Sequence, residues 1–331
     1  KIKFKKILIY EKIITVLFGY FFFPLIISIP FYFSLYNISF LHCYFEAISG
    51  FTSTGFTIFD NIKQIDASLI LWRSTSQWIG GLYFLFSLIL LIDIFDENLK
   101  KSVTNYISFD STEISKQSLK IIILYAFLTF VIFLLFKLIN LRTFDAFNFS
   151  LTIISSGGFL SINNFDNLFV TDISKIILSI TILFSYFSLF FTYNLFFFKK
   201  RNINYLSEDF YLIIYLFFII SFIFVFFNID NNFLNILVSI TSSVSNLGIS
   251  FEDSPKNLSF IFLILVIIGG SFFSTSSGLR VIKVLSLIKF SLNNLLSHSK
   301  PNQIYLNKVS LTNSNTDKAD INKYFLTIII F

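Results

Sequence analysis

The 331-residue chain has no methionine, one cysteine, two histidines and four prolines. The single cysteine, Cys43, excludes an internal disulfide and a cysteine-based metal cage. His42 and His298 lie far apart in the sequence, and we interpret each as an interfacial or loop residue rather than a metal ligand. Because a native start codon would supply methionine, we expect residues to be missing before Lys1. The apolar run 324–331 suggests that the chain also stops short.

Charged residues are scarce as well, at 13% of the chain, whereas 55% is hydrophobic, 20% is aromatic and the mean hydropathy is +0.78. A water-soluble domain of this length cannot bury so much apolar surface. Uncharged runs at 13–36, 176–198 and 210–229 reach the roughly 20 residues that a spanning helix needs, and they lack the alternation of barrel strands. The first run has no small-residue cleavage site, so no secretory signal is predicted. The sequence therefore predicts an all-α polytopic membrane protein in a lipid bilayer.

Only 11 glycines occur, yet three of them close short loops rich in serine and threonine. Gly55, Gly158 and Gly248 lie 103 and 90 residues apart, which is the spacing of an internal repeat. Irregular backbone at membrane depth is tolerated only where it is buried in protein or lines a wet cavity, so three occurrences predict a pore. The first glycine loop comprises Thr52, Ser53, Thr54, Gly55 and Phe56, the second Ser155, Ser156, Gly157, Gly158 and Phe159, and the third Ser245, Asn246, Leu247, Gly248 and Ile249.

Each glycine loop follows an apolar segment too short to cross a membrane and precedes a longer one. We therefore predict repeats of span, half-helix, loop and span, with internal duplication in another kind of transporter as the alternative. In the first repeat (1–98), the predicted helices are 13–36, 40–50 and 69–92. In the second repeat (99–206), they are 121–140, 144–154 and 176–198. In the third repeat (207–300), they are 210–229, 233–244 and 258–287. Residues 301–331 are predicted to form a cytoplasmic linker and, from Tyr324, the start of a fourth repeat.

Lysine and arginine collect on one predicted side of the membrane. Of the 25 such residues, 19 lie in the segments 1–12, 93–120, 199–209 and 279–323. Because positive residues mark the cytoplasmic face, we expect the glycine loops to open outward, and we interpret the basic segments as topology determinants without a nucleic-acid partner. Acidic residues lie near the glycine loops, at Asp60, Asp66, Asp166, Asp172, Glu252 and Asp253.

Loops of this composition suit the passage of a monovalent cation. An ion in the membrane needs oxygens to replace its water, and rings of backbone carbonyls supply them. Glycine permits the positive φ that turns a carbonyl toward an axis, and a preceding half-helix points the negative end of its dipole at the path. Nothing in this chemistry indicates covalent catalysis. Taken singly, each loop could equally be an ordinary serine–glycine turn.

The residues around the loops resemble the pore motifs of the Trk/Ktr/HKT potassium transporters, most closely those of the bacterial potassium-uptake membrane subunits. The resemblance covers nearly the whole chain. It is carried by residues 45–55 (FEAISGFTSTG), 72–74 (WRS) with 77–81 (QWIGG), 145–148 (DAFN) with 152–159 (TIISSGGF), and 268–270 (IGG) with 274–275 (ST) and 278–284 (GLRVIKV).

The resemblance implies four pseudo-equivalent repeats around one path, as in a potassium channel, with three complete repeats here and a fourth filter segment beyond Phe331. Filter positions would be Thr54-Gly55, Gly157-Gly158 and Leu247-Gly248 with their neighbours. It also implies K⁺ as the transported ion, no covalently bound cofactor and a location in the bacterial cytoplasmic (inner) membrane. Family members form homodimers and sit on a cytosolic nucleotide-binding regulatory ring, so we expect both kinds of partner.

A second irregular stretch interrupts the apolar segment 258–289. Each glycine weakens a helix by about 1 kcal/mol, and the hydroxyls compete for its backbone, so we expect this stretch to face the cavity below the filter. The resemblance implies a movable gate, and a packed helix kink is the alternative. The stretch contains Gly269, Gly270, Ser271, Ser274, Thr275, Ser276, Ser277 and Gly278.

Arg73 is the one basic residue near the start of a predicted return span. It could form a cation barrier near the pore, or it could brace the half-helix by pairing with Glu46. We favour the brace, because an arginine in the path would repel a cation.

The chain departs from the family pattern at Asn246-Leu247, at Phe272-Phe273 with Ser276-Ser277, and at Leu82-Tyr83. A sodium-permeable or poorly selective cation transporter is therefore the second hypothesis. A rival from another class is a polytopic membrane glycosyltransferase or polymerase, which would need clusters of acids, arginine or histidine in its outer loops. The sequence shows no such cluster, and we predict no enzyme. A structural scaffold would give no reason for three glycine loops.

Overall fold

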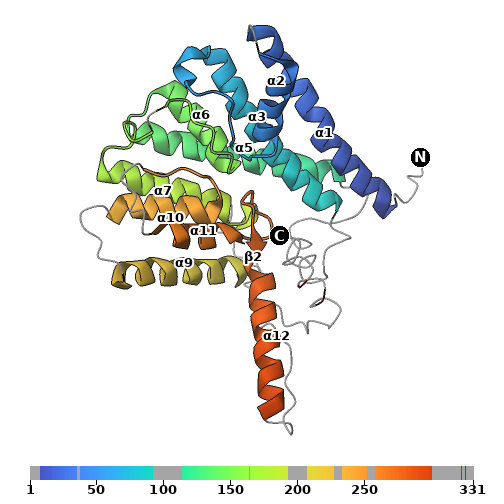
Figure 1. The fold of residues 1–331 in the computed structure, drawn as a ribbon, viewed down its shortest axis with the longest axis vertical. Coiled ribbons are helices and arrows are strands. Elements are labelled where there is room, and N and C mark those ends of the chain that lie inside the picture. Colours follow the sequence, from blue (N-terminus) through green and yellow to red (C-terminus); the bar gives the residue numbers. More distant parts are fainter. Residues whose placement is uncertain are drawn as a thin grey trace.

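The computed structural model describes residues 8–35, 38–91, 114–163, 165–192, 207–226, 233–251 and 258–299, with the isolated positions 322 and 325. Over these ranges the chain is almost entirely helical, as predicted (Figure 1). The exception is a pair of parallel two-residue strands, β1 (Ile268–Gly269) and β2 (Leu279–Arg280), in which Ile268 pairs with Leu279. The predicted fourth repeat from Tyr324 lies outside the described residues.

Three helices in the described ranges are long and apolar enough to cross a membrane: α1 (Ile9–Ser34), Ser118–Leu138 of α5 (Ile114–Leu138), and Asp209–Phe226 of α9 (Ser207–Phe226). Phe18 of α1 and Phe217 of α9 are among their many exposed apolar side chains, which suits helices surrounded by lipid. α3 (Ala67–Leu90) has a comparable length, but polar side chains within it, including Arg73 and Gln77, are buried against protein.

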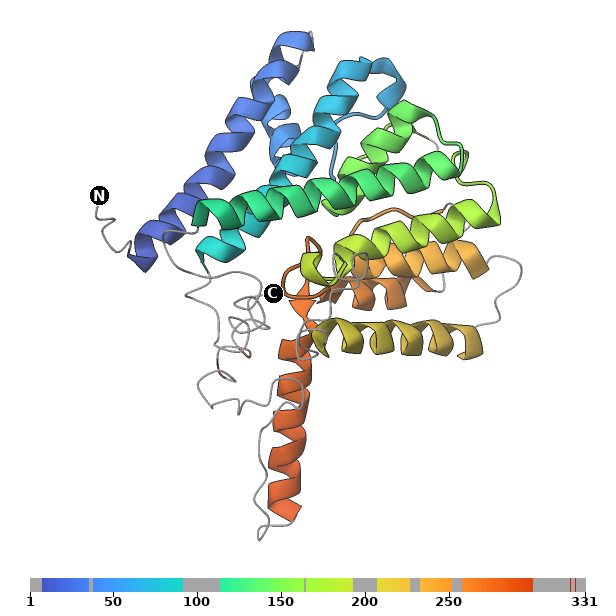
Figure 2. The same cartoon turned by 180° about the vertical axis from the view of Figure 1, so that it is seen from behind.

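Three shorter helices precede the glycine loops. They are α2 (Phe40–Phe51), α6 (Thr143–Ile154) and α10 (Phe233–Ser245), with 12, 12 and 13 residues. At about 1.5 Å per residue they are too short to cross the ~30 Å hydrocarbon core. As Figures 1 and 2 show, α2 packs on α1 and α3, and α6 packs on α3 and α5, whereas α10 packs on α7 (Asp172–Tyr186) and α11 (Ser259–Ile267).

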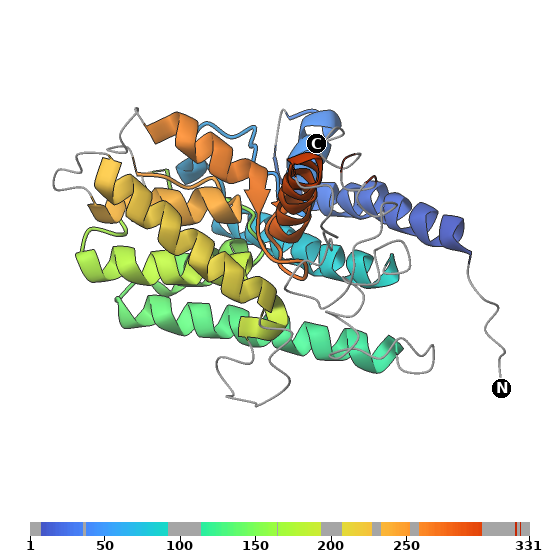
Figure 3. The ribbon, with the colours of Figure 1, turned by 90° about the horizontal axis from the view of Figure 1, so that it is seen from below.

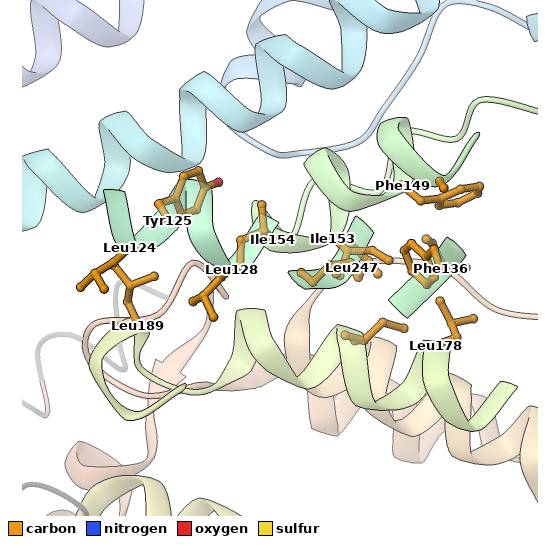
Figure 4. Close-up of a cluster of buried hydrophobic side chains, with 14 of the residues drawn as sticks. Leu124, Tyr125, Leu128, Phe136, Phe149, Ile153, Ile154, Leu178, Leu189 and Leu247 are labelled. Atoms are coloured by element: carbon orange, nitrogen blue, oxygen red, sulfur yellow. The ribbon is translucent and has the colours of Figure 1, made fainter. Parts of the chain in front are cut away.

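A buried apolar cluster joins α5, α6 and α7 (Figure 4). Leu128 and Phe136 come from α5, Phe149 from α6 and Leu178 from α7, and all four are almost completely buried. Leu247 of the third glycine loop enters the same cluster. Its side chain therefore anchors that loop in the core, which gives a packing reason for a bulky residue at this position.

The run 176–198, predicted as one span, is broken in the structure. α7 ends at Tyr186, and helix resumes at residue 189 and continues to residue 192, where this described range ends. The carbonyls freed at the break accept hydrogen bonds from a later segment: the Ser271 amide donates to Tyr186 O (3.0 Å), and the Ser276 amide donates to Ser185 O (3.2 Å). The apolar sequence hides the break because its partners lie far along the chain.

The segment 258–287, predicted as a single interrupted span, is also divided. α11 stops at Ile267, and α12 (Val281–Ser299) starts only after β2. α12 leaves the bundle in a direction that crosses α11 and α9 (Figures 1 and 3). The interruption is therefore a complete break with its own hydrogen bonds, and the interpretation as a simple helix kink is wrong.

Candidate functional site

The three glycine loops share one backbone conformation. Ser53, Ser156 and Asn246 have φ values of 54°, 53° and 59°, which is the left-handed region that residues with a Cβ rarely adopt. In the first loop the Ser53 amide donates to Gly50 O (3.0 Å) and the Thr54 amide donates to Ser49 O (2.9 Å). The second and third loops repeat both bonds at the corresponding residues. These paired bonds form the Schellman motif, so α2, α6 and α10 end in the same way.

A second left-handed residue follows two positions later in each loop, and it is always glycine: Gly55, Gly158 and Gly248 have φ values of 82°, 75° and 76°. The absence of side chains lets the loops touch. A Cβ on Gly55 would lie 2.8 Å from Gly157 O, and a Cβ on Gly158 would lie 2.3 Å from Leu247 O. A Cβ on Gly248 would have no described atom within 4 Å. The loops therefore contact one another in succession, from the first to the third.

Side chains behind the loops hold their backbones in place. Ser49 Oγ donates to Phe56 O in the first loop, and Ser242 Oγ accepts the Ile249 amide (2.8 Å) in the third. The backbone of the second loop is held by Gln77 of α3, which is fully buried. Its side-chain Nε2 donates to Gly157 O, and its Oε1 accepts the backbone amide of Phe159 (3.3 Å). The sequence resemblance includes Gln77, but its role as a brace follows only from the fold.

A cavity of about 620 Å³ lies where the glycine loops meet the loop between β1 and β2. The predicted residues that line it are Thr52, Ser53, Thr54, Ser155, Ser156, Asn246 and Gly248 from the glycine loops, with Thr275, Ser277 and Gly278. The carboxyl ends of α2, α6 and α10 lead into these loops, so the negative ends of three helix dipoles lie near the cavity.

The other predicted glycine-loop residues are not among those that line the cavity, and of these Gly55, Gly157 and Gly158 take part in the contacts between loops. Phe56 is exposed, whereas Phe159, Ser245, Leu247 and Ile249 are buried in the surrounding protein. Of the predicted acidic residues, Glu252 and Asp253 lie outside the described ranges, and Asp60 is exposed beyond the first glycine loop.

The segment from Gly269 to Gly278, here called the 269–278 loop, is largely buried and hydrogen-bonded to itself. The Gly270 amide donates to Ser276 Oγ (3.0 Å), and Ser274 Oγ lies 3.0 Å from Ser276 Oγ. Arg280 lines the cavity and is hydrogen-bonded to several parts of this loop. Its Nη1 donates to Ser271 O at 2.7 Å, and to Gly270 O, Ser274 Oγ and Ser276 O, each at 3.2 Å. Sequence reasoning did not single out Arg280.

Glu46 and Arg73 form a buried ion pair behind the first glycine loop. Arg73 Nε lies 2.8 Å from Glu46 Oε1, and the side chains are 1% and 0% exposed. The second carboxylate oxygen accepts the Ile58 amide (2.9 Å), and Thr57 Oγ1 bonds to both partners at 3.0 Å. The guanidinium lies 4.3 Å from the centre of the Phe159 ring. Neither charge lines the cavity, and both hold the chain that leaves the first loop.

Asp209 is a buried acid that sequence reasoning missed. It lies in the first turn of α9, and its two carboxylate oxygens accept the Ser188 amide (3.0 Å) and the Ser188 hydroxyl (2.8 Å). It therefore satisfies the backbone at the break after α7. The sequence shows an acidic pair, Glu208-Asp209, at the start of an apolar run, but this pattern does not identify the partner of Asp209.

No protein-family model matches the chain. An uncharacterized cation transporter of Methanocaldococcus jannaschii is 26% identical over 309 residues, which are 89% of this chain and 61% of that protein. The Trk system potassium uptake protein TrkG of Escherichia coli is 25% identical over 289 residues, 80% of this chain and 58% of that protein. The chain thus spans about three fifths of the length of these curated relatives.

The fold also matches a solved structure. The crystal structure of the potassium transporter TrkH from Vibrio parahaemolyticus aligns with a TM-score of 0.81 at 20% identity, covering 100% of this chain and 70% of that chain. The named relatives are transporters and not enzymes, so they lend no support to the glycosyltransferase hypothesis. In sequence and in fold, the chain is a membrane-protein relative of the Trk potassium uptake proteins, as its motifs predicted.

Proposed function

We propose that the protein conducts K⁺ across the bacterial cytoplasmic membrane through a path formed by its glycine loops. The observation that carries this proposal is the succession of close contacts from Gly55 to Gly157 O and from Gly158 to Leu247 O, beside one cavity. Contact between the loops in this order is what a common path lined by their backbone oxygens requires. The names of the relatives, which are potassium uptake proteins, support K⁺ as the ion.

The chemistry of the cavity suits a cation that has lost part of its water. Thr52, Thr54 and Ser155 line the cavity, with the hydroxyls of Thr52 and Thr54 bonded to each other and that of Ser155 bonded to α6, and three helix dipoles present their negative ends. An inside-negative potential contributes about 2.3 kcal/mol per charge per 100 mV, which is enough to drive uptake without a chemical step by the protein. In this proposal the 269–278 loop is the gate, because Thr275, Ser277 and Gly278 line the cavity.

The proposed architecture is a pseudo-four-fold pore in which 1–98, 99–206 and 207–300 are three of the repeats. Gly248 meets no atom of the described residues where Gly55 and Gly158 each meet a neighbouring carbonyl, so in this proposal a fourth segment of the same kind would complete the ring there. Homodimer formation and a cytosolic nucleotide-binding regulatory subunit belong to the same proposal, and the "Trk system" names of the relatives support a partner subunit.

Growth at limiting potassium tests the proposal. The full-length protein is expected to restore growth of cells that lack their own potassium uptake systems, and to accumulate rubidium in them. Ser28→Ala, which removes a hydroxyl bonded only within α1, is the control and should behave as wild type. Failure of the wild-type protein to restore growth or rubidium uptake, despite normal abundance in the membrane, would contradict the proposal.

Two glycines allow a sharper test within the same loops. Gly158→Ala and Gly248→Ala impose the same positive-φ strain, but only the first places a Cβ 2.3 Å from a backbone oxygen. The left-handed alanine costs about 1–2 kcal/mol in both variants. We expect Gly158→Ala to lower rubidium uptake about tenfold more than Gly248→Ala, because only Gly158→Ala adds a clash with Leu247 O. Equal losses would show that the contact between loops does not matter for conduction.

A sodium-permeable path is the second candidate, favoured by the third loop. Asn246 and Leu247 depart from the family pattern, and Leu247 O is the oxygen that Gly158 approaches. The ratio of rubidium to sodium flux into vesicles distinguishes the potassium-selective path from the sodium-permeable path. A ratio well above one supports potassium selectivity, and a ratio near one supports a poorly selective path.

A further inference from the structure

Asn246 differs from its counterparts in the other glycine loops. The left-handed position that closes α2 and α6 holds a serine, Ser53 or Ser156, whereas the position that closes α10 holds an asparagine. The longer side chain of Asn246 reaches across the cavity wall, and its Nδ2 donates to Ser277 Oγ at 2.7 Å. The third glycine loop is thereby joined to the 269–278 loop.

A second side-chain bond joins the 269–278 loop to the end of α6. Thr275 Oγ1 donates to Ile154 O (2.7 Å), the carbonyl directly before the second glycine loop. By contrast, the bonds from Arg280 and among Ser274, Ser276 and Gly270 are internal and fix the shape of the 269–278 loop. The loop is therefore a preformed unit, attached to the end of α6 and to the third glycine loop through the hydroxyls of Thr275 and Ser277.

We propose that Asn246 is a positioning residue that holds the 269–278 loop against the third glycine loop. Breaking the Asn246–Ser277 bond removes the direct attachment of this loop to the third glycine loop, whereas the bonds from Thr275 to Ile154 O and from the loop amides to α7 remain. Because one hydrogen bond belongs to both loops, a shift of either loop disturbs the other. This inference rests on the proposed function, and it adds that the state of the third glycine loop regulates the gate.

The experiment compares Asn246→Ser, Ser277→Ala and the double variant in the full-length protein. Serine at position 246 is already compatible with this backbone, because Ser53 and Ser156 adopt it. The control is Asn163→Ser, which removes a similar amide bridge between loops away from the cavity: Asn163 Oδ1 accepts the Ile62 amide (2.8 Å) and its Nδ2 donates to Asn61 (2.6 Å).

Two readouts are used. The first is deuterium exchange of the loop amides, including those of Ser271 and Ser276, which are hydrogen-bonded to α7. The second is rubidium flux into vesicles without any regulatory protein. We expect each single variant to raise the exchange rate of the loop amides and the rubidium flux about fivefold, which is the ratio that follows from losing one hydrogen bond. The double variant should show no further rise in either quantity. The control should leave both unchanged.

The two readouts separate the inference from the proposed function. If wild-type vesicles carry neither rubidium nor sodium, the transport proposal fails, and amide exchange alone still decides the role of Asn246. Unchanged exchange in Asn246→Ser overturns the inference, even when flux is normal. Independent effects that multiply in the double variant would overturn it as well, because they would show that Asn246 and Ser277 do not act through a common bond.

Discussion

At the scale of single residues, the strongest constraint behind the first glycine loop is the Glu46–Arg73 pair. A carboxylate and a guanidinium buried in this way cost several kcal/mol to desolvate, and their mutual attraction and hydrogen bonds offset that cost. Here the pair also binds Thr57 and the Ile58 amide. It therefore fixes the direction in which the chain leaves the loop, and it keeps the positive charge of Arg73 away from the cavity.

Removing one member of this pair should destabilise the protein more than removing both. Glu46→Gln or Arg73→Met leaves an uncompensated buried charge, which we expect to lower the free energy of unfolding by about 3–5 kcal/mol. The double variant should lose less than the sum of the two. Thermal unfolding in detergent measures this, with Asp60→Asn at an exposed position as the control. Strictly additive losses would argue against coupling.

The residue pattern alone left two roles open for Arg73. The sequence offered Arg73 as a brace or as a barrier, and an electrostatic argument favoured the brace. Gln77, Arg280 and Asp209 received no role, because each acts on the backbone of a segment 10 to 80 residues away. Such contacts leave no local pattern in the sequence.

At the scale of elements, the break after α7 and the 269–278 loop explain each other. A helix that stops inside an apolar region must find donors for its last carbonyls. Ser271 and Ser276 supply two of them, and Asp209 binds the Ser188 amide just beyond the break. α7, α9 and the loop are therefore linked by polar contacts inside an otherwise apolar part of the protein.

Substitution of Asp209 tests this link. Asp209→Ala leaves the Ser188 amide and hydroxyl without their partner, which should cost about 1–3 kcal/mol of stability for each buried group. Asp209→Asn keeps an acceptor for the amide and a donor for the hydroxyl, so it should cost clearly less. Unfolding midpoints of both variants in the same detergent provide the measurement. Equal destabilisation by alanine and asparagine would mean that the hydrogen bonds to Ser188 contribute little.

At the scale of the whole molecule, the three glycine loops and the 269–278 loop surround one cavity although about 220 residues separate the first from the last. The charge distribution of the sequence orients this arrangement, with the glycine loops outward and α12 toward the cytoplasm. This orientation is a prediction of the sequence, because the helices alone do not define the two sides of a membrane.

Cysteine labelling from one side of the membrane tests the orientation. The natural Cys43 is buried, so the background labelling should be low. Asp60→Cys, exposed beyond the first glycine loop, should react with an impermeant maleimide in intact cells. Ser297→Cys, exposed near the end of α12, should react only after the membrane is opened. The reverse pattern would invert the proposed topology.

The sequence by itself determined the class of the protein, the helices other than those in 176–198 and 258–287, and the positions of the glycine loops. Long apolar runs require helices in lipid, and Ser/Thr-rich loops closed by glycine are local patterns. Only the tertiary structure decided which loops touch, where α7 breaks and which groups satisfy the freed backbone. Those outcomes depend on close approaches such as Gly158 to Leu247 O, between residues that sequence distance does not connect.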